Sequence, residues 1–493
     1  MNKNMKIAVV GGGTAGFVSA LIIKSTFPNI NVDVIRSTKI GTIGVGEGST
    51  EHWTKFMDYV GITAGTLIKE CDATFKAGIM FEDWSKEPYL QNVHDPVVGD
   101  HMGYPLILGK LIGENVPVKD FVGKYLWRNE TPYMKFIEER PGETGVSQYH
   151  FNTAKLNEFL TNFSISKGIN VFDDEITRVN ISERNDVTSI EGEKQTYDYD
   201  FYVDCTGFAR LLIKELGAEW QSYSKYLKMK EAIVFPTEYT DTIDPRGKEI
   251  PMWTLAKAMD AGWMFRIPVW DRKGNGYIFD SDFITAEEAQ KEVENYLGHG
   301  IEVAKHLKFD PGALDKPWIG NVCATGLSAS FVEPLEASSI GTTIQQTFLL
   351  VSRLINYNDQ SVNLYNKEVN EITDNIRDFI ALHYITERRD TPFWKAVSET
   401  SLPESLEQNL QMWKTRMPVE KDLGSNILFN EYNFSIVMHA LNLFDTDKIL
   451  EQYNHLPPDA HEFAERKCQE KINFDQIKAI PHKMMLGLLR TLV

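Results

Sequence analysis

The feature that most constrains the fold is a glycine-rich turn near the start of the chain. The apolar segment Met5–Val10, MKIAVV, predicts a short strand, and it leads directly into Gly-Gly-Gly-Thr-Ala-Gly at residues 11–16. The apolar pattern of the following residues, FVSALIIKSTF, predicts a helix. In this strand–turn–helix setting, a GxGxxG motif permits a tight turn and brings the positive end of the helix to a pyrophosphate. The motif therefore predicts a Rossmann-like α/β module that binds a dinucleotide, rather than a turn that binds nothing.

The same region indicates which residues contact the dinucleotide. The expected contacts within the turn are Gly11, Gly13, Thr14, Ala15 and Gly16. The second strand should end in a carboxylate for the ribose hydroxyls, but Arg36 stands there, so Ser37 or Lys39 would take this role. A second glycine-rich segment, IGTIGVGEGST at 40–50, contains Glu47 and could wrap a longer cofactor, which favours FAD over NAD. No second GxGxxG follows a predicted strand, so we do not expect a separate NAD(P)H domain.

Charge and cysteine content exclude several classes of protein. The 493 residues include 51 Lys and Arg against 69 Asp and Glu, and the net charge of −18 disfavours nucleic acid and anionic membrane surfaces as partners. No uninterrupted apolar segment is long enough to cross a bilayer. The four cysteines are far apart and form no CxxC pair, which argues against a structural zinc site and a disulfide framework. We therefore expect a cytoplasmic protein without a metal site.

One lysine lies in unusually apolar surroundings. In CDATFKAGIMFEDW, residues 71–84, Lys76 stands between Phe75 and a stretch that predicts a buried strand. An unpaired buried ammonium is costly, so such a lysine extends to water, pairs with a carboxylate or serves chemistry. From residue type alone, the first two explanations are the more common ones.

The pattern along the chain predicts one interleaved body. It is rich in strands to about Asp280, and it becomes helical from about Thr285, interrupted by a strand and loop within WIGNVCATGLSASFVEPLE. After Gly341, an amphipathic run begins a mostly helical C-terminal portion. We expect residues 1–355 to form a cofactor-binding module with an interleaved, substrate-facing sheet. Residues 356–493 would cover that module and part of the substrate pocket.

Several segments, in order, resemble the flavin-dependent halogenases of the tryptophan halogenase family. The resemblance covers most of the chain, and its ordered set of segments is highly specific. The matching segments are the turn at 11–16, IGVGEGST, FKAGIMFEDW, YHFNTAKLNEFL from Tyr149, VDCTGF, SFVEPLEASSIG from Ser330 and LHYITERRDTPFW from Leu382. The resemblance implies the flavoprotein monooxygenase/halogenase fold, an α/β (α+β) fold with a mostly helical C-terminal portion.

The resemblance also implies a reaction and assigns residues to it. In this family, FADH2, oxygen and halide yield hypohalous acid, which travels through a tunnel to a lysine beside an electron-rich aromatic substrate. Lys76 matches that lysine, and it would act either as an ammonium donor or as an amine that forms a haloamine. Glu336 matches the carboxylate that polarises the halogenating species or takes the ring proton. Ser338 and Ser339 fall in the halide loop, and Leu327 and Ile340 are further expected FAD contacts. A separate NAD(P)H:flavin reductase would supply the FADH2.

The sequence departs from the family pattern at three places. The family's Glu-Ser-Thr-Gly is Glu336-Ala337-Ser338-Ser339 here, and the family's GWxWxIP is GWMFRIP, with Phe265 replacing the second tryptophan. The segment FNEYNFSIVMHALNLFD from Phe429 shows no clear copy of the clamp that tryptophan-specific members carry. We therefore expect bromide or iodide to be preferred over chloride, and a small, indole-like aromatic to be preferred over free tryptophan.

Some alternatives stay open at the level of sequence. An FAD-dependent aromatic hydroxylase would share the fold and the cofactor, and a non-catalytic flavin-binding protein is a weaker alternative. His94 and His101, in a loop-like region, could stack on a substrate, although loop histidines are more often simply solvated. The oligomeric state is also open, with a homodimer as one option.

Overall fold

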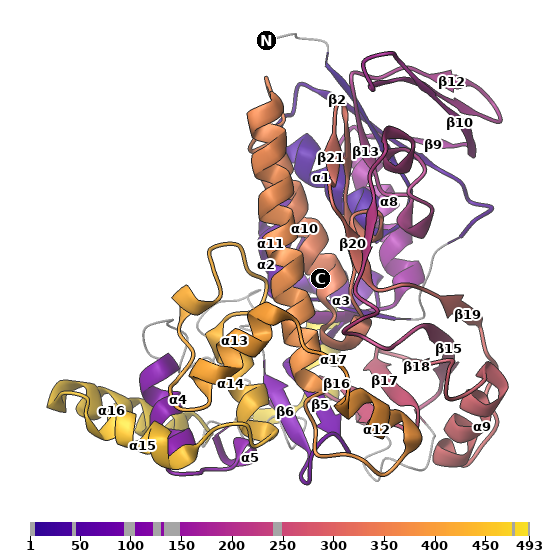
Figure 1. Cartoon of the computed structure of the whole chain (residues 1–493). Coiled ribbons are helices and arrows are strands. Elements are labelled where there is room, and N and C mark those ends of the chain that lie inside the picture. Colours follow the sequence, from indigo (N-terminus) through magenta and orange to yellow (C-terminus); the bar gives the residue numbers. More distant parts are fainter. Residues whose placement is uncertain are drawn as a thin grey trace.

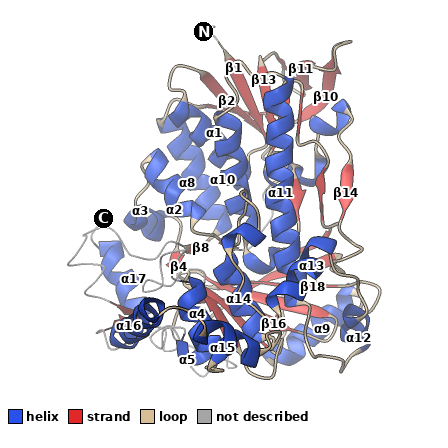
Figure 2. Ribbon diagram, turned by 60° about the vertical axis from the view of Figure 1, so that its left-hand side comes forward, coloured by secondary structure: helices blue, strands red, loops and turns tan. Residues whose placement is uncertain are grey.

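Two large sheets at opposite ends of the molecule define the architecture. The computed structural model describes residues 5–41, 46–92, 104–121, 130–132, 148–239, 249–475 and 479–491. The long helix α11 (Asp359–His383) runs from the region of one sheet towards the other (Figure 1, Figure 2).

The first sheet has six strands and confirms the Rossmann-like prediction. Its order is β21-β22-β13-β1-β2-β9, and all neighbours are parallel except β21 with β22. Helix α1 (Thr14–Thr26) leaves the end of β1, as the motif predicts, and packs on the sheet and against α8 and α10. The strand bounds are β1 Lys6–Val10, β2 Asn31–Arg36, β9 Asn170–Asp173, β13 Phe201–Asp204, β21 Trp318–Ile319 and β22 Val322–Ala324.

The second sheet has seven strands in the order β19-β15-β18-β17-β16-β5-β6. Its neighbours are antiparallel except for the parallel pair β5 and β16. The predicted buried strand after Lys76 is β5, and the GWMFRIP segment is β17. The bounds are β5 Gly78–Glu82, β6 Tyr89–Asn92, β15 Glu231–Thr237, β16 Trp253–Ala258, β17 Gly262–Pro268, β18 Lys273–Phe279 and β19 Lys305–Lys308.

Four small sheets accompany the two large ones in the described part of the chain. In one of them β8 lies between β3 and β4, so Lys76, which follows β4 directly, lies at the junction of a small sheet and the seven-stranded sheet. The bounds are β3 Glu47–Gly48, β4 Thr74–Phe75, β7 Glu130–Pro132, β8 Tyr149–Phe151, β10 Ile176–Ile181, β11 Val187–Gly192, β12 Thr196–Tyr197, β14 Trp220–Ser222, β20 Gly312–Leu314, β23 Ser330–Phe331 and β24 Ala479–Pro481.

The C-terminal portion of the chain, after Gly341, is mostly helical, as predicted. A capping box at Thr285 starts α9, while α10 begins at Ser338, before Gly341, because the backbone turns at Ala337. The α-helices with described bounds are α2 His52–Val60, α3 Ala64–Glu70, α4 Tyr104–Gly113, α5 Val118–Phe121, α8 Thr153–Ser166, α9 Ala286–Leu297, α10 Ser338–Val351, α12 Pro392–Ser398, α13 Glu404–Trp413, α14 Glu431–Ala440, α15 Thr446–Asn454, α16 Pro458–Asp475 and α17 His482–Thr491. The short 3₁₀ helices are η1 Gly207–Ala209, η2 Ile213–Leu216, η3 Gly326–Ser328, η4 Pro334–Glu336 and η5 Glu420–Asp422.

The C-terminal helices pack on earlier parts of the chain. Helices α15 and α16 pack on α4, and α14 packs on β6 (Figure 1). The division into residues 1–355 and 356–493 stays a prediction. His94 and His101 lie outside the described residues, so their predicted role is untested.

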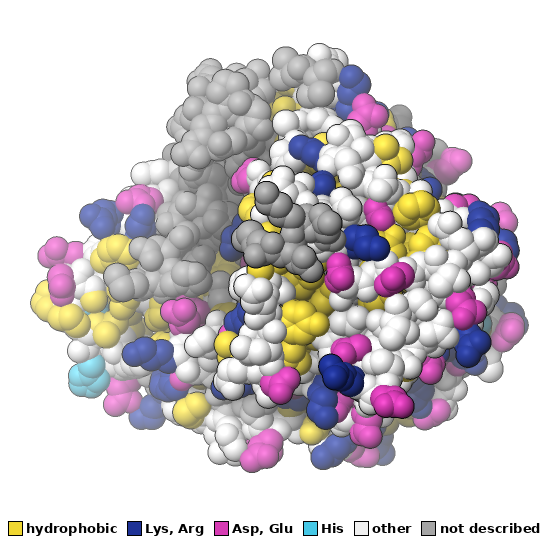
Figure 3. All heavy atoms as spheres, turned by 90° about the horizontal axis from the view of Figure 1, so that it is seen from above, with side chains coloured by type: hydrophobic (Ala, Val, Ile, Leu, Met, Phe, Trp, Pro, Cys, Tyr) yellow, Lys and Arg dark blue, Asp and Glu magenta, His cyan; other side chains and the backbone are white. Residues whose placement is uncertain are grey.

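The described surface carries charges of both signs. In the view from above, Lys, Arg, Asp and Glu side chains are spread among polar groups over the visible face (Figure 3). Within the described ranges, no helix has the length and apolar character needed to span a bilayer. The same ranges hold no group of three or more His, Cys, Asp or Glu side chains placed to bind a metal ion.

Candidate active site

A cavity of about 630 Å³ lies between the two large sheets. One wall comes from the glycine turn and the end of β2, and the opposite wall comes from β15, β16, β17 and β18. Apolar side chains of the second wall include Ala232, Val234, Phe265 and Ile278. The cavity therefore joins the positive end of α1 to an apolar chamber, a combination that suits a cofactor with phosphates at one end and a flat ring system at the other.

The glycine turn is shaped for close backbone packing. Gly11 has φ +121°, and a Cβ there would lie 2.1 Å from the carbonyl oxygen of Cys205. A Cβ at Gly16 would lie 1.9 Å from the carbonyl oxygen of Gly11, so Gly16 serves the packing of helix on strand and does not line the cavity. Gly13 faces open space along the cavity, and α1 has no side-chain cap. Its first backbone N–H groups are therefore free to bind phosphate oxygens.

Most of the other predicted cofactor contacts also reach the cavity. Thr14, Ala15, Ser37, Glu47, Leu327 and Ile340 all line it. Thr14 Oγ1 donates a hydrogen bond to Glu47 Oε2 at 3.1 Å. Desolvation raises the pKa of Glu47 to about 7, although the Thr14 hydrogen bond opposes this shift. Glu47 is thus a carboxyl group that changes charge near neutral pH beside the first turn of α1.

The structure does not bring Lys39 to the cavity. Its ammonium forms an ion pair with Glu193 at 2.5 Å, with Glu175 3.9 Å away, and the side chain is 64% exposed. The hydrogen bond with Glu193 is the main reason that the pKa of Lys39 is raised. Ser37 and Arg36 line the cavity at this point instead.

Lys76 is buried directly behind the cavity wall. Its side chain is 1% exposed, and its Nζ donates a hydrogen bond to the carbonyl oxygen of Ser49 at 2.9 Å. Burial lowers the pKa of Lys76 to about 8, while the negative charges of Glu336 and Glu51 act in the opposite direction. The lysine therefore neither extends to water nor forms a close ion pair with any described residue, which removes the two ordinary explanations for it.

Glu336 is the second buried charge at this place. It ends η4, is 1% exposed, and its neighbours Leu335 and Ala337 line the cavity. Neither carboxylate oxygen accepts a hydrogen bond from the described residues. A buried carboxyl group whose oxygens accept no well-aligned hydrogen bond is costly, so it is suited to receive a proton or a ligand.

Gly48 brings the lysine and the predicted halide loop together. A Cβ at Gly48 would lie 3.3 Å from the Cβ of Ala337 and 3.6 Å from the Cδ of Lys76. Ala337 has φ +52°, a left-handed conformation, and it precedes α10, which has no side-chain cap. Ser339 lines the cavity, whereas Ser338 is buried and does not.

Two features at this site were not predicted from the sequence. Glu333 is fully buried, and burial raises its pKa to about 8, although Tyr384 Oη donates a hydrogen bond to it at 2.7 Å. His383 Nε2 lies 2.9 Å from Glu336 Oε1. The sequence signal that could have identified these contacts is the LHYITERRDTPFW segment, which contains His383 and Tyr384. The resemblance matched this segment as a whole and assigned no role to either residue.

The residues present fit FAD. The uncapped start of α1 and the open side of Gly13 suit the pyrophosphate, and the wall with Val234, Phe265 and Ile278 suits the ring system. When bound in reduced form, FAD would supply, together with oxygen, the oxidising power for the reaction.

Comparison with known proteins places this site in a family. A family model described as tryptophan halogenase matches residues 6–454. The tryptophan 6-halogenase SttH of Streptomyces toxytricini is 29% identical over 447 residues, covering 84% of each chain. The crystal structure of a tryptophan halogenase from Shewanella frigidimarina has a TM-score of 0.89 at 25% identity, covering 99% of this chain and 98% of that one.

A third similar protein carries information on halide. Tar14, described as a tryptophan C-6 flavin-dependent halogenase (chlorinase) from taromycin biosynthesis, has a TM-score of 0.87 at 25% identity and covers 99% of this chain and all of its own. Its description does not support a preference for bromide or iodide. With a family model matching most of the chain, this protein belongs to the tryptophan halogenase family and is an FADH2-dependent halogenase that takes its reduced flavin from a separate reductase.

Proposed function

We propose that this halogenase uses Lys76 and Glu336 to transfer halogen from hypohalous acid to a small, electron-rich aromatic ring of the indole type. The observation that carries the proposal is the burial of both charged groups behind the cavity wall, with few partners. Among the described residues, Lys76 forms one hydrogen bond and Glu336 forms no well-aligned one, so few contacts compensate for the burial of the two groups.

The chemistry assigns one proton transfer to each residue. A ring carbon forms a bond to the halogen while the O–X bond of the hypohalous acid breaks. The Lys76 ammonium donates a proton to the departing hydroxide, which leaves as water. Glu336 accepts the proton lost from the ring and returns it to Lys76, so both residues regain their starting states.

The test of this proposal uses purified protein, FAD, NADH and a generic flavin reductase. Indoles and phenols are supplied with chloride, bromide or iodide, and products are read by mass spectrometry. Lys76→Ala should abolish halogenated product while FAD binding and oxygen consumption stay normal. Lys308→Ala, which removes a lysine that is 74% exposed, is the matched control. Normal product yield from Lys76→Ala would overturn the assignment.

The same assay separates the alternatives. Hydroxylated product formed without halide would indicate an aromatic monooxygenase. Binding of FAD without any aromatic product would indicate a non-catalytic flavin protein. A cytoplasmic location and a homodimer stay predictions.

We further propose that bromide or iodide is preferred over chloride, and that free indole is a better substrate than free tryptophan. The support for the halide preference is the Ala337-Ser338-Ser339 sequence, which lacks the family's glycine at the start of α10. The support for the substrate preference is the segment from Phe429, which shows no clear copy of the tryptophan clamp. Larger halides lose their water more easily and are more readily oxidised. A difference of only about 1.4 kcal/mol changes such a preference tenfold.

Competition assays test both preferences. Equimolar chloride and bromide are supplied together, first with indole and then with tryptophan. Mostly chlorinated product would contradict the proposed halide preference. Faster turnover of tryptophan than of indole would contradict the proposed substrate preference.

A further inference from the structure

His383 is the last residue of α11 and is completely buried. Its Nδ1 lies 2.8 Å from the carbonyl oxygen of Phe379. Because a carbonyl oxygen only accepts hydrogen bonds, Nδ1 carries the hydrogen. The ring stacks on Phe81 at a centroid distance of 4.9 Å and meets Phe379 edge-on at 4.8 Å. The orientation of the imidazole is therefore fixed by the ring contacts with Phe81 and Phe379 and by the hydrogen bond at Nδ1.

The other nitrogen faces the proposed catalytic carboxylate. His383 Nε2 lies 2.9 Å from Glu336 Oε1, and both side chains are fully buried. With the hydrogen on Nδ1, a neutral ring would present only a lone pair to the carboxylate, and the two acceptors would repel each other. The contact is favourable when one proton lies between Nε2 and Oε1. The two atoms are within hydrogen-bond distance, although the present geometry does not meet the angle of a good hydrogen bond.

Tyr384, the residue after His383, contacts Glu333 at the other end of the turn formed by residues 333–336. Tyr384 Oη donates to Glu333 Oε2 at 2.7 Å, and Trp263 Nε1 lies 3.4 Å from the same oxygen. Consecutive residues at the end of α11 thus contact both glutamates of the 333–336 turn. The position of Glu336 therefore depends on α11.

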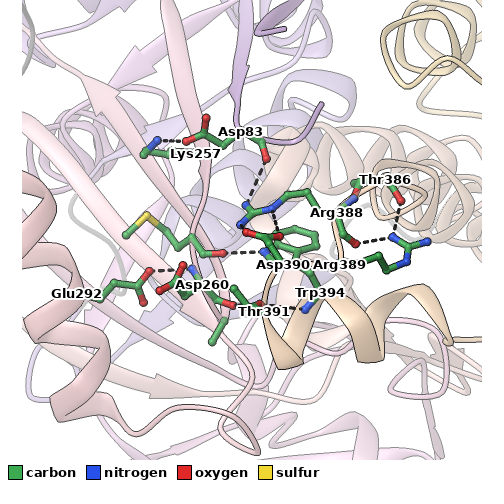
Figure 4. Close-up of polar contacts among 12 residues, drawn as sticks. Asp83, Lys257, Asp260, Glu292, Thr386, Arg388, Arg389, Asp390, Thr391 and Trp394 are labelled. Atoms are coloured by element: carbon green, nitrogen blue, oxygen red, sulfur yellow. Dashed lines mark hydrogen bonds and ion pairs between the residues drawn. The ribbon is translucent and has the colours of Figure 1, made fainter. Parts of the chain in front are cut away.

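The segment after α11 fixes this helix end to the seven-stranded sheet. Arg388 pairs with Asp390 through two nitrogens and donates to the carbonyl oxygen of Asp83 (Figure 4). The Arg388 guanidinium also lies 4.7 Å from the ring of Trp394, whose Nε1 donates to the carbonyl oxygen of Met259 at 2.8 Å. The rings of Trp84, Trp394 and Tyr384 pack against one another, with Trp84 5.6 Å from Trp394 and 5.4 Å from Tyr384, and with Tyr384 6.4 Å from Trp394. These contacts attach the end of α11, which carries His383, to the seven-stranded sheet.

We propose that His383 is a positioning residue for Glu336. Its Nε2 holds a proton against Oε1, which fixes the carboxyl group and leaves Oε2 free to accept the proton from the halogenated ring. His383 keeps its own proton throughout the cycle and touches neither substrate nor flavin. This inference rests on the proposed role of Glu336 as the proton acceptor.

The test compares variants that keep the ring with variants that keep the N–H. His383→Phe retains a ring for the stack on Phe81 but has no Nε2. It should lower the rate of halogenated product by about tenfold or more, with FAD binding and oxygen consumption unchanged. His383→Gln places an amide N–H near the position of Nε2 and should recover most of the rate. His383→Leu serves as a second variant without Nε2 in case the phenylalanine variant does not fold. The matched control is His306→Gln, which alters a histidine–glutamate pair, with Glu231 at 2.6 Å, at the edge of the seven-stranded sheet.

A double-mutant cycle shows whether His383 acts through Glu336. In an E336Q background, adding His383→Phe should change the residual rate by less than about twofold. Any of three results would overturn the inference: full activity of both variants without Nε2, no recovery by His383→Gln, or equal losses in the E336Q and wild-type backgrounds. Absence of halogenated product from the wild-type protein would overturn the proposed function as well, so the two failures are distinguishable.

Discussion

Lys76 shows burial and nearby charge acting in opposite directions on one side chain. Burial lowers its pKa to about 8, and the carboxylates of Glu336 and Glu51 limit the shift. The ammonium form therefore dominates at neutral pH and is lost as the pH rises through about 8. If that form is the proton donor, the rate of halogenation, measured with reductase in excess, should decline over this range.

Glu51→Gln tests the electrostatic part of this account. The substitution removes a charge that raises the pKa of Lys76, so the alkaline decline in rate should move to lower pH. Glu70→Gln, which removes an exposed carboxylate that does not act on Lys76, is the matched control. An unchanged decline in Glu51→Gln would show that another group controls it.

We expect FAD binding to depend on pH through Glu47. Because its pKa is raised to about 7, its negative charge develops as the pH rises from 6 to 8, beside the first turn of α1. A carboxylate there repels the pyrophosphate, so FAD affinity should fall over this range. Fluorescence titration at several pH values should show the fall in the wild-type protein and in Glu193→Gln, but not in Glu47→Gln. Equal wild-type affinity at pH 6 and 8 would contradict the prediction.

At the scale of elements, local pattern accounts for some of the structure and long-range packing for the rest. The β1–turn–α1 unit, β5 and the helical C-terminal portion follow from glycine spacing and apolar periodicity. Lys39 was misplaced because its partner Glu193 is distant in sequence, and only the fold brings them together. The contact between His383 and Glu336 has the same origin. Sequence periodicity does not specify such pairs.

Helix α17 supports the strand that precedes Lys76. His482 Nε2 accepts a hydrogen bond from the backbone N–H of Phe75 at 3.3 Å, and the two rings stack at 5.7 Å. Burial lowers the pKa of His482 to about 4, so the ring is neutral at working pH. His482→Ala leaves a buried N–H unpaired and should lower the free energy of unfolding by about 2 kcal/mol, together with the rate of halogenation.

Urea denaturation followed by circular dichroism measures that change in stability. His461→Ala on α16 is the control, because this half-buried histidine contacts only its own neighbourhood, through Leu456 and Tyr453. Wild-type stability and activity in His482→Ala would show that α17 is dispensable for the lysine.

At the scale of the whole molecule, we expect α11 to prevent the two predicted parts of the chain from folding separately. Near the start of α11, the side chain of Asn366 accepts a hydrogen bond from the backbone N–H of Trp318 at 2.8 Å and donates one to the carbonyl oxygen of Trp318 at 2.9 Å. Trp318 belongs to the six-stranded sheet. At the end of α11, His383 and Tyr384 hold the 333–336 turn at the far side of the cavity. A fragment of residues 1–355 would lose both sets of contacts and expose the apolar surface that α11 covers.

We expect this fragment to bind no FAD and to lack a cooperative thermal transition. The full chain should unfold in one transition that FAD raises, since ligand binding stabilises only the folded state. Circular dichroism and FAD titration of both proteins provide the measurement, and a fragment with the FAD affinity of the full chain would show that residues 1–355 are an independent domain.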